Sequence, residues 1–229
     1  MTTAPLLREF CAENFTLVPA AIAAGAARIE LCDNLAVGGT TPSAGVMERT
    51  VDFAHLHDTV VMAMIRPRGG DFVYTEEELS IMEADIFSAC EAGVDGIVLG
   101  CLRSCEDGTF ALDVPALERL VTVAEHAADA FEMELELTFH MAFDALPQAA
   151  QPEAVHTLAS LGFSRILTHG GLAGTPINQN LGHLQELVDC AGEDIIILPG
   201  AGITWENAED VASALGVHEV HGTKIVQLV

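Results

Sequence analysis

The feature that most constrains the fold is a regular alternation of short aliphatic runs with longer amphipathic stretches. The aliphatic runs predict eight strands, over residues 6–12, 28–33, 59–66, 96–102, 134–140, 165–169, 194–199 and 219–226. The stretches between them predict helices that begin near residues 17, 46, 75, 115, 152, 181 and 207. Strands that alternate with helices are typical of repeated βα units and of a parallel sheet.

One of these helices has a clear beginning and a clear end. Thr75 is followed three residues later by Glu78, which is the spacing of a capping box. Apolar residues then recur at helical intervals, beginning with Leu79 and Met82, until Gly93 ends the pattern. This segment is therefore the most strongly predicted helix of the chain.

Eight strands with seven intervening helices favour an α/β fold of the closed (β/α)₈ type, the TIM barrel, although the pattern alone also permits a doubly wound open sheet. The 229 residues suit one barrel, and no Pro-rich or Gly/Ser-rich linker divides them. We therefore expect a single domain over residues 1–229. The last helix is absent, so one flank of the barrel would be bare, and we expect a homo-oligomer to cover it.

The charge and cysteine content narrow the possible partners and the cellular location. With 34 acidic against 9 basic residues, the formal net charge is -25, which repels nucleic acid and anionic lipid. We expect neither nucleic acid nor membrane as a partner. The chain begins without a secretion signal and has no apolar run long enough to cross a bilayer, which predicts a cytoplasmic protein. Its six irregularly spaced cysteines are then expected to be reduced thiols.

A short pattern, a Glu followed two positions later by Cys or His, recurs in three of the expected strands. Two of them carry a Glu two positions before a Cys, and the last carries a Glu two positions before a His. The residues are Glu9, Cys11, Glu30, Cys32, Glu219 and His221. Side chains alternate along a strand, and strands eight, one and two are neighbours in a closed barrel, so we expect these groups to converge at one opening.

Two interpretations of this convergence remain open. Buried cysteines are commonly just small apolar core residues. Carboxylates inside a packed barrel are costly unless they are paired or hydrated, so their recurrence favours a functional, water-filled mouth.

Several segments resemble the signature blocks of the CutC family, and they occur in the family's order. They are IELC (29–32), GGTTPS (38–43), IRPRGGDF (65–72), TFH with AFD (138–140 and 142–144) and PGAGIT (199–204). The block around Arg66 and Arg68 is long and compositionally unusual, which makes coincidence a poor explanation. The resemblance implies a TIM-like barrel linked to copper homeostasis and to Cu(I) binding.

By the same resemblance, the copper ligands are cysteines at the ends of the first two strands, which correspond to Cys11 and Cys32. Soft thiolates select Cu(I), and a nearby His221 or Met64 would suit such a site. A copper ion is therefore the first expected ligand, held by Cys11, Cys32 and His221 and serving copper handling.

The same rim also fits a barrel enzyme of lyase or hydrolase type that acts on a small anionic substrate. Arg66 and Arg68 could form a fork for a carboxylate or phosphate, with Glu30 beside them and the turn of Gly200 and Gly202 completing the site. The alternative for the arginines is a structural salt-bridge network with Glu30 or Asp71.

In this enzyme hypothesis, His140 is the general acid or base, oriented by Asp71 or Asp144. Schiff-base chemistry would require the only lysine, Lys224, to point inward. Two positions depart from the family pattern: Met141 replaces a common Arg, and His169 replaces a common Ser. A third possibility is a structural or interaction protein whose barrel mouth has no function.

Overall fold

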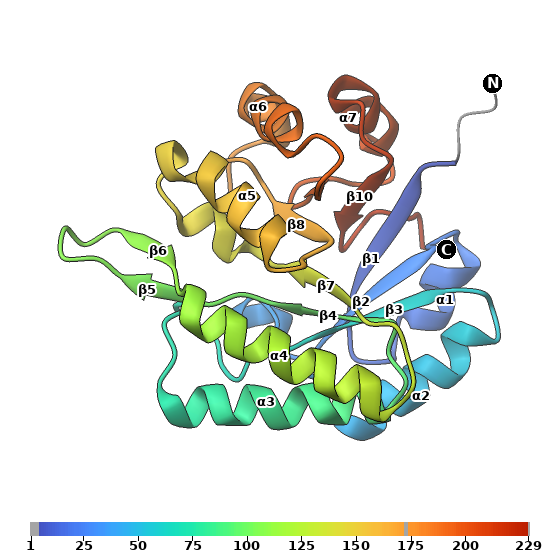
Figure 1. The fold of residues 1–229 in the computed structure, drawn as a ribbon. Helices are drawn as coiled ribbons and strands as arrows, with labels where there is room; N and C mark the ends of the chain where they lie inside the picture. The colour runs from blue at the N-terminus through green and yellow to red at the C-terminus, as the bar shows by residue number, and fades with distance from the viewer. Residues whose placement is uncertain (1–4, 172–173, 229) are drawn as a thin grey trace.

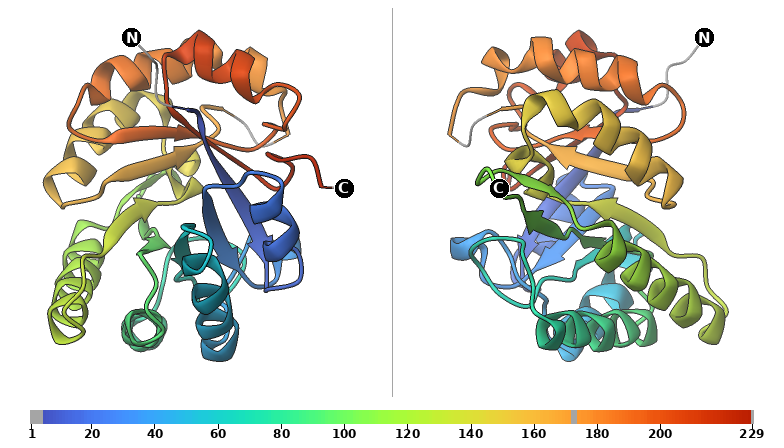
Figure 2. Two further views of the ribbon diagram at one scale, coloured as in Figure 1. Left: turned by 90° about the vertical axis from the view of Figure 1, so that its right-hand side faces the viewer. Right: turned by 60° about the vertical axis from the view of Figure 1, so that its left-hand side comes forward.

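The computed structural model describes residues 5–171 and 174–228. Eight parallel strands form one sheet in the order β10-β1-β2-β3-β4-β7-β8-β9, with the helices on its outer side (Figure 1). Strands β9 and β10, the two ends of this order, lie next to each other, so the sheet is a nearly closed barrel. Two further views show the helical layer from other sides (Figure 2). The single-domain (β/α)₈ prediction is confirmed as a fold class.

The elements follow one another in a regular order along the chain. The barrel strands are β1 (Leu7–Glu13), β2 (Arg28–Cys32), β3 (Val60–Met64), β4 (Gly96–Leu99), β7 (Glu136–Phe139), β8 (Arg165–Thr168), β9 (Ile196–Pro199) and β10 (Glu219–Gly222). The α-helices are α1 (Val18–Ala23), α2 (Ala44–His55), α3 (Glu76–Glu91), α4 (Val114–Ala130), α5 (Gln151–Ser160), α6 (Leu181–Ala191) and α7 (Ala208–Leu215). Residues 223–228, which follow β10, form no helix, as the sequence predicts.

The first strand lies between the last and the second, so β1 and β10 are side by side although they are far apart in the sequence. In the register, Glu9 is opposite His221 on β10, and Cys11 is opposite Glu30 on β2. The expectation that strand eight pairs with strand one is therefore confirmed. This pairing carries the Glu and Cys side chains of β1 and β2 into the barrel interior.

Local sequence signals account for the start of α3. The Thr75 side chain accepts a hydrogen bond from the Glu78 backbone N–H at 3.3 Å, and the Glu78 carboxylate accepts one from the Thr75 N–H at 2.9 Å. Glu76 and Glu77 add negative charge to the first turn, where the helix dipole favours it. The capping-box prediction is confirmed.

Most predicted strands end earlier than expected, and two of them differ most from the prediction. The fourth stops at Leu99, and Leu102 instead opens an antiparallel hairpin of β5 (Leu102–Ser104) and β6 (Phe110–Leu112), which projects from the barrel (Figure 1). Its turn is built on Asp107 and Gly108, a pair that favours tight hairpins. The eighth strand stops at Gly222, where the chain passes so close to the backbone of Ile203 that a side chain would not fit.

The apolar side chains form two separate groups. A large one lies between the outside of the sheet and the helices, and it includes Ile29, Leu31 and Leu120. A small one lies inside the barrel and consists of Cys11, Cys32, Met62, Met64 and Val98. We call this second group the sulfur cluster, because four of its five members carry sulfur. In the described part of the chain, no helix combines the length and the apolarity needed to span a bilayer.

Candidate functional site

A cavity of about 320 Å³ opens at the carboxyl ends of the barrel strands. Its polar lining includes Cys11 from β1, Glu30 from β2 and His221 from β10, together with Arg66 and His140 from the segments after β3 and β7. Apolar side chains, among them Leu35, Met64, Phe72, Met141 and Leu167, form much of the remaining wall. The carboxyl ends of the strands are where barrels of this fold carry their functional groups.

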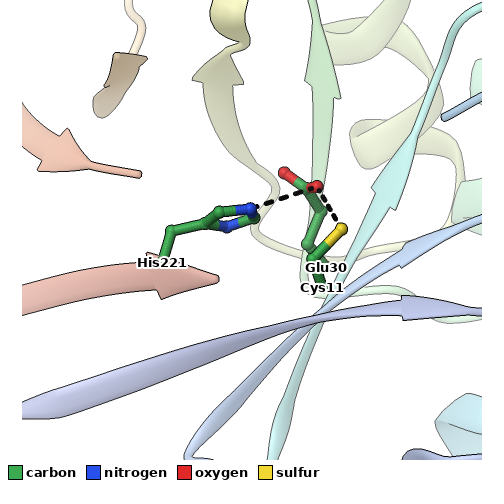
Figure 3. Close-up of side chains that lie close together, drawn as sticks. All are labelled: Cys11, Glu30 and His221. Atoms are coloured by element: carbon green, nitrogen blue, oxygen red, sulfur yellow. Dashed lines mark hydrogen bonds and ion pairs between the residues drawn. The ribbon is translucent and has the colours of Figure 1, made fainter. Parts of the chain in front are cut away.

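Three side chains from neighbouring strands meet at the floor of this cavity. Cys11 Sγ lies 3.3 Å from Glu30 Oε1, and His221 Nε2 lies 3.8 Å from the same oxygen. Figure 3 shows the three groups pointing toward one another from β1, β2 and β10. Their potential ligand atoms all lie within 4.8 Å of one another. Cys32 Sγ approaches the same carboxylate oxygen at 3.6 Å, so both predicted cysteines surround Glu30.

Glu9 holds the imidazole of His221 from below. His221 Nδ1 lies 2.7 Å from Glu9 Oε1, so the Nδ1–H donates to the carboxylate and Nε2 is left to face Glu30 and the cavity. Glu9 also forms a buried ion pair with Arg28. Burial would raise the pKa of Glu9, but Arg28 and His221 outweigh it and bring the pKa to about 2. Such a carboxylate fixes the orientation and the tautomer of a histidine ligand.

A chain of ion pairs continues from Glu9 toward the other end of the barrel. Arg28 contacts Glu219 at 2.6 Å, and Glu219 in turn contacts Arg165 at 2.8 Å. Arg165 then reaches Glu136 at 2.5 Å. Of the six residues in the Glu-x-Cys and Glu-x-His pattern, Cys11, Glu30 and His221 line the cavity, whereas Glu219 belongs to the chain of ion pairs below it. Glu219 stands at the first position of β10, one step below His221, and this placement corrects the expectation from sequence.

The ionisable groups at the cavity floor shift the pKa values of one another. The Cys32 thiol, with a further contribution from His221, lowers the pKa of Cys11 to about 5 despite burial. Burial raises the pKa of the Glu30 carboxyl. For His221, burial lowers the pKa, but Glu30, Cys11 and Glu9 together raise it well above its ordinary value. The lowered pKa of Cys11 and the raised pKa of His221 both favour a thiolate next to an imidazolium at the floor.

The two arginines of the predicted fork point in different directions. Arg66 is buried, and its guanidinium donates to the carbonyls of Val37, Gly39 and Gly70 at 3.0, 2.9 and 2.8 Å. Arg68 is partly exposed outside the cavity.

Arg68 instead forms ion pairs with Glu78 at 2.5 Å and Asp71 at 3.1 Å. The fork is therefore not formed, because the turn after β3 carries Arg68 away from the mouth. Arg68 thus forms the structural salt bridge with Asp71 that was the alternative to a fork. Arg66 is held by backbone carbonyls and not by Glu30.

His140 lines the cavity without either of its predicted partners. Its Nδ1 accepts a hydrogen bond from the Ala142 N–H at 3.2 Å, and its Nε2 has no hydrogen-bond partner among the described residues. Burial, together with the Arg66 charge, lowers the pKa of His140 to about 3, so the ring is neutral.

Asp144 does not orient this ring. Its carboxylate accepts hydrogen bonds from Thr168 Oγ1 at 2.5 Å and from the backbone of His169 and Gly170. Asp71 is exposed and paired with Arg68. The predicted pairing of His140 with Asp71 or Asp144 is thus corrected, because Asp71 pairs with Arg68 and Asp144 is bound by Thr168 and by the backbone that follows β8.

The two glycines of the predicted turn lie beside the cavity. A side chain at Gly200 would come within 2.5 Å of Leu167 and 3.2 Å of the His221 ring, so this glycine makes room for the imidazole. Gly202 lines the cavity next to Ala201, and both have left-handed φ angles, +81° and 57°. Their contribution to an anion site stays a prediction.

Two further residues that the sequence left unassigned lie outside the cavity. His169 is buried and lies 2.9 Å from the Thr175 carbonyl and 3.2 Å from that of Gly200. Lys224 is exposed, so it does not offer an inward amine for a Schiff base.

Sequence reasoning missed two residues around His140. The Phe72 ring lies 4.8 Å from the His140 ring and also 4.8 Å from the centre of the Arg66 guanidinium. Gly100 is the second, since a side chain there would come within 2.7 Å of His140 Nδ1. Phe72 closes the IRPRGGDF block, so its position in that block was an available signal.

The chain is similar to known proteins along nearly its whole length. The model of the CutC family matches residues 6–226. A CutC family protein of Enterococcus faecalis is 55% identical over 221 residues, which cover 96% of this chain and 100% of the relative. A CutC family protein of Streptococcus pyogenes is 46% identical with the same coverage.

Solved structures agree with this similarity. A structure from Streptococcus agalactiae, described as that of a candidate copper homeostasis protein CutC, has a TM-score of 0.87 at 43% identity, over 96% of this chain and 100% of that one. The deoxyribose phosphate aldolase of Aeropyrum pernix has a TM-score of 0.66 at 12% identity, over 97% and 86% of the two chains. The second likeness shows the fold alone.

Proposed function

The chain belongs to the CutC family, and from this premise we propose that it binds Cu(I) at the floor of the barrel mouth and serves in copper handling. Cys11 is the primary ligand, and Cys32 and His221 complete the site. The family's association with copper homeostasis supports this proposal.

The observation that carries the proposal is the convergence of Cys11, Glu30 and His221, whose ligand atoms lie within 4.8 Å of one another at the base of an open cavity. Metal bonds to sulfur and nitrogen are about 2.0–2.3 Å long, so two ligands of one ion are at most about 4.6 Å apart. The groups therefore need only a small inward shift to share an ion.

The chemistry of these donors favours a soft cation. Cys11 offers a thiolate at neutral pH because its pKa is lowered to about 5, and Met64 adds a thioether to the same cavity wall. Thiolate and thioether sulfur select Cu(I) over harder ions. His221 must release its Nε2 proton before it can bind a metal, so we expect Cu(I) uptake to release protons.

An anaerobic titration in competition with a chromophoric Cu(I) chelator tests the proposal. We expect the reduced protein to hold one tightly bound Cu(I), and the double variant Cys11→Ser with Cys32→Ser to lose most of this affinity. The matched control is Cys105→Ser with Cys190→Ser, which removes two thiols that lie outside the cavity. Unchanged affinity in the first variant, or an equal loss in the control, would refute the copper function.

Several residues that the enzyme hypothesis requires do not take the positions predicted for them. Arg68 and Asp71 pair with each other outside the cavity, and Asp144 binds Thr168 and the backbone near it. His140 is left without an acidic partner in the described chain, so its low pKa suits a hydrogen-bond donor better than a proton-transfer group. The remaining alternative, a structural or interaction role, would stand if the cavity binds neither metal nor anion.

We also propose that the protein is cytoplasmic and homo-oligomeric. A reducing compartment keeps Cys11 and Cys32 available as ligands. No helix follows β10 in residues 223–228, so a second copy could cover that flank. Sedimentation equilibrium checks the second point: a monomer at all concentrations would rule it out.

A further inference from the structure

We infer that the wall of the cavity formed by Arg66, Phe72 and His140 is a binding subsite for a small carboxylate. This subsite lies on the segments after β3 and β7, whereas the thiols belong to β1 and β2. It does not depend on the proposed copper function, since neither Arg66 nor His140 is among the proposed ligands.

The first argument is that Arg66 is a buried cation without a counter-ion. Arg66 is 3% exposed and its guanidinium donates to three backbone carbonyls, while no carboxylate of the described residues is within ion-pairing distance. The two other buried arginines differ: Arg28 pairs with Glu9 and Glu219, and Arg165 with Glu136 and Glu219. A buried charge is costly unless it is neutralised. In a chain with 34 acidic residues, this cation is left for an external anion.

The second argument is an unused donor beside it. His140 Nδ1 accepts from the Ala142 N–H, so the ring proton is on Nε2, and that atom is buried without an acceptor in the described chain. The ring stays neutral at physiological pH because burial and Arg66 lower the pKa of His140 to about 3. His140 is therefore a permanent donor, and a buried donor without an acceptor is a destabilising feature that a ligand would relieve.

The third argument is that the two groups share one place. The Phe72 ring packs 4.8 Å from the His140 ring and 4.8 Å from the Arg66 guanidinium centre, and all three side chains line the cavity. The Arg66 Nε–H is also buried without an acceptor in the described chain. One ligand can thus meet the cation and the imidazole donor together.

The number of free donors and the lining define the ligand class. Arg66 already uses both of its terminal nitrogens on carbonyls, so few N–H groups are left, which suits the two oxygens of a carboxylate better than the three of a phosphate. The adjoining wall is apolar, with Leu35, Met141 and Leu167, and accepts a short aliphatic portion. A volume of about 320 Å³ corresponds to roughly ten water molecules, so the ligand is small.

Calorimetric titration of the reduced, metal-free protein with butyrate tests the inference, with butyramide as the neutral probe of the same shape. We expect saturable binding of butyrate. Loss of a hydrogen bond to a charged group costs about 1.5–3 kcal/mol, so butyramide should bind at least about tenfold more weakly, and Arg66→Met and His140→Phe should each weaken butyrate by a similar factor. His140→Gln, which keeps an N–H donor, should restore part of the affinity.

Arg68→Met is the matched control, because it removes the neighbouring arginine that points out of the cavity, and it should leave butyrate binding unchanged. If Arg66→Met does not fold, the His140 imidazole ¹⁵N resonances of the wild type give a second readout, and butyrate should shift them. Absence of saturable butyrate binding, equal binding of butyramide, tighter binding of inorganic phosphate, or retention of butyrate by His140→Phe would each overturn the inference.

The result is distinguishable from a failure of the copper proposal. Cys11→Ser with Cys32→Ser should still bind butyrate, and His140→Phe should still bind Cu(I). Each site can therefore be lost while the other remains.

Discussion

The outside and the inside of the barrel sheet are built from different kinds of residues. The layer between sheet and helices is ordinary apolar packing, with Ile29 and Leu31 of β2 fully buried in it. The interior is lined by the sulfur cluster and by the chain of ion pairs from Glu136 to Glu9. The outer layer thus supplies packing, while the interior holds the groups that can bind a ligand.

A single strand shows both roles. Along β2, the side chains of Ile29 and Leu31 face the helices, while Arg28, Glu30 and Cys32 face the interior. Because side chains alternate with a period of two, one five-residue strand can serve both layers. A substitution outside should therefore change stability alone, and one inside should change ionic balance or binding.

The largest expected effect comes from breaking the interior ion pairs. Arg28→Met leaves Glu9 and Glu219 buried with one partner fewer, which should destabilise the protein by about 3–5 kcal/mol. Urea denaturation at neutral pH measures it. The matched control is Arg119→Met, which also loses two carboxylate partners but on the surface, and its cost should stay within about 1 kcal/mol. An equal loss of stability in the two variants would mean that the interior ion pairs contribute no more than the surface ones.

A cavity in the outer layer should have a slightly smaller effect. Leu120 on α4 is fully buried, and Leu120→Ala should lower the free energy of unfolding by about 2–4 kcal/mol. Cu(I) and butyrate affinities of the folded variant should be unchanged, because the residue lies on the helix side of the sheet. A large change in either affinity would contradict the separation of the two layers.

The contribution of His140 to the pH dependence of stability has a definite sign. Folded His140 binds a proton only near pH 3, while an unfolded imidazole does so near pH 6.5, so between these values the unfolded chain binds more protons. Acidification therefore destabilises the fold through this residue, by about 1.6 kcal/mol between pH 6.5 and pH 5. The difference between wild type and His140→Gln in denaturation at these two pH values isolates the effect. A difference that does not change with pH would show that the ring titrates normally.

The sequence predicted the interior better than the rim. The period-two alternation and the closure of strand eight on strand one brought Glu9, Cys11, Glu30 and His221 together as expected. These positions depend only on strand register, which the hydrophobic pattern fixes.

The errors lie in the loops. Arg66 and Arg68 are two residues apart, yet only Arg66 faces the cavity, because the backbone after β3 leaves the strand and turns. The Asp144 carboxylate accepts hydrogen bonds from Thr168 and from the backbone of His169, and no sequence pattern encodes these contacts. The hairpin β5–β6 had its signal in Asp107 and Gly108, but the preceding apolar run concealed it. Side-chain directions outside regular strands depend on local backbone geometry, which a single sequence does not determine.

The smallest effect on stability is expected from the two methionines of the sulfur cluster, which also test which interior side chains bind the ion. Met64 and Met62 both belong to the sulfur cluster, but only Met64 lines the cavity. Replacement of either by Leu conserves volume and should change stability by less than about 1.5 kcal/mol. Cu(I) affinity should fall in Met64→Leu, because the thioether is a soft ligand on the wall of the same cavity, and stay constant in Met62→Leu. Equal affinities in the two variants would assign Met64 to packing, where an unbranched side chain fills an irregular space, and would leave the thiolates and the imidazole to bind the ion alone.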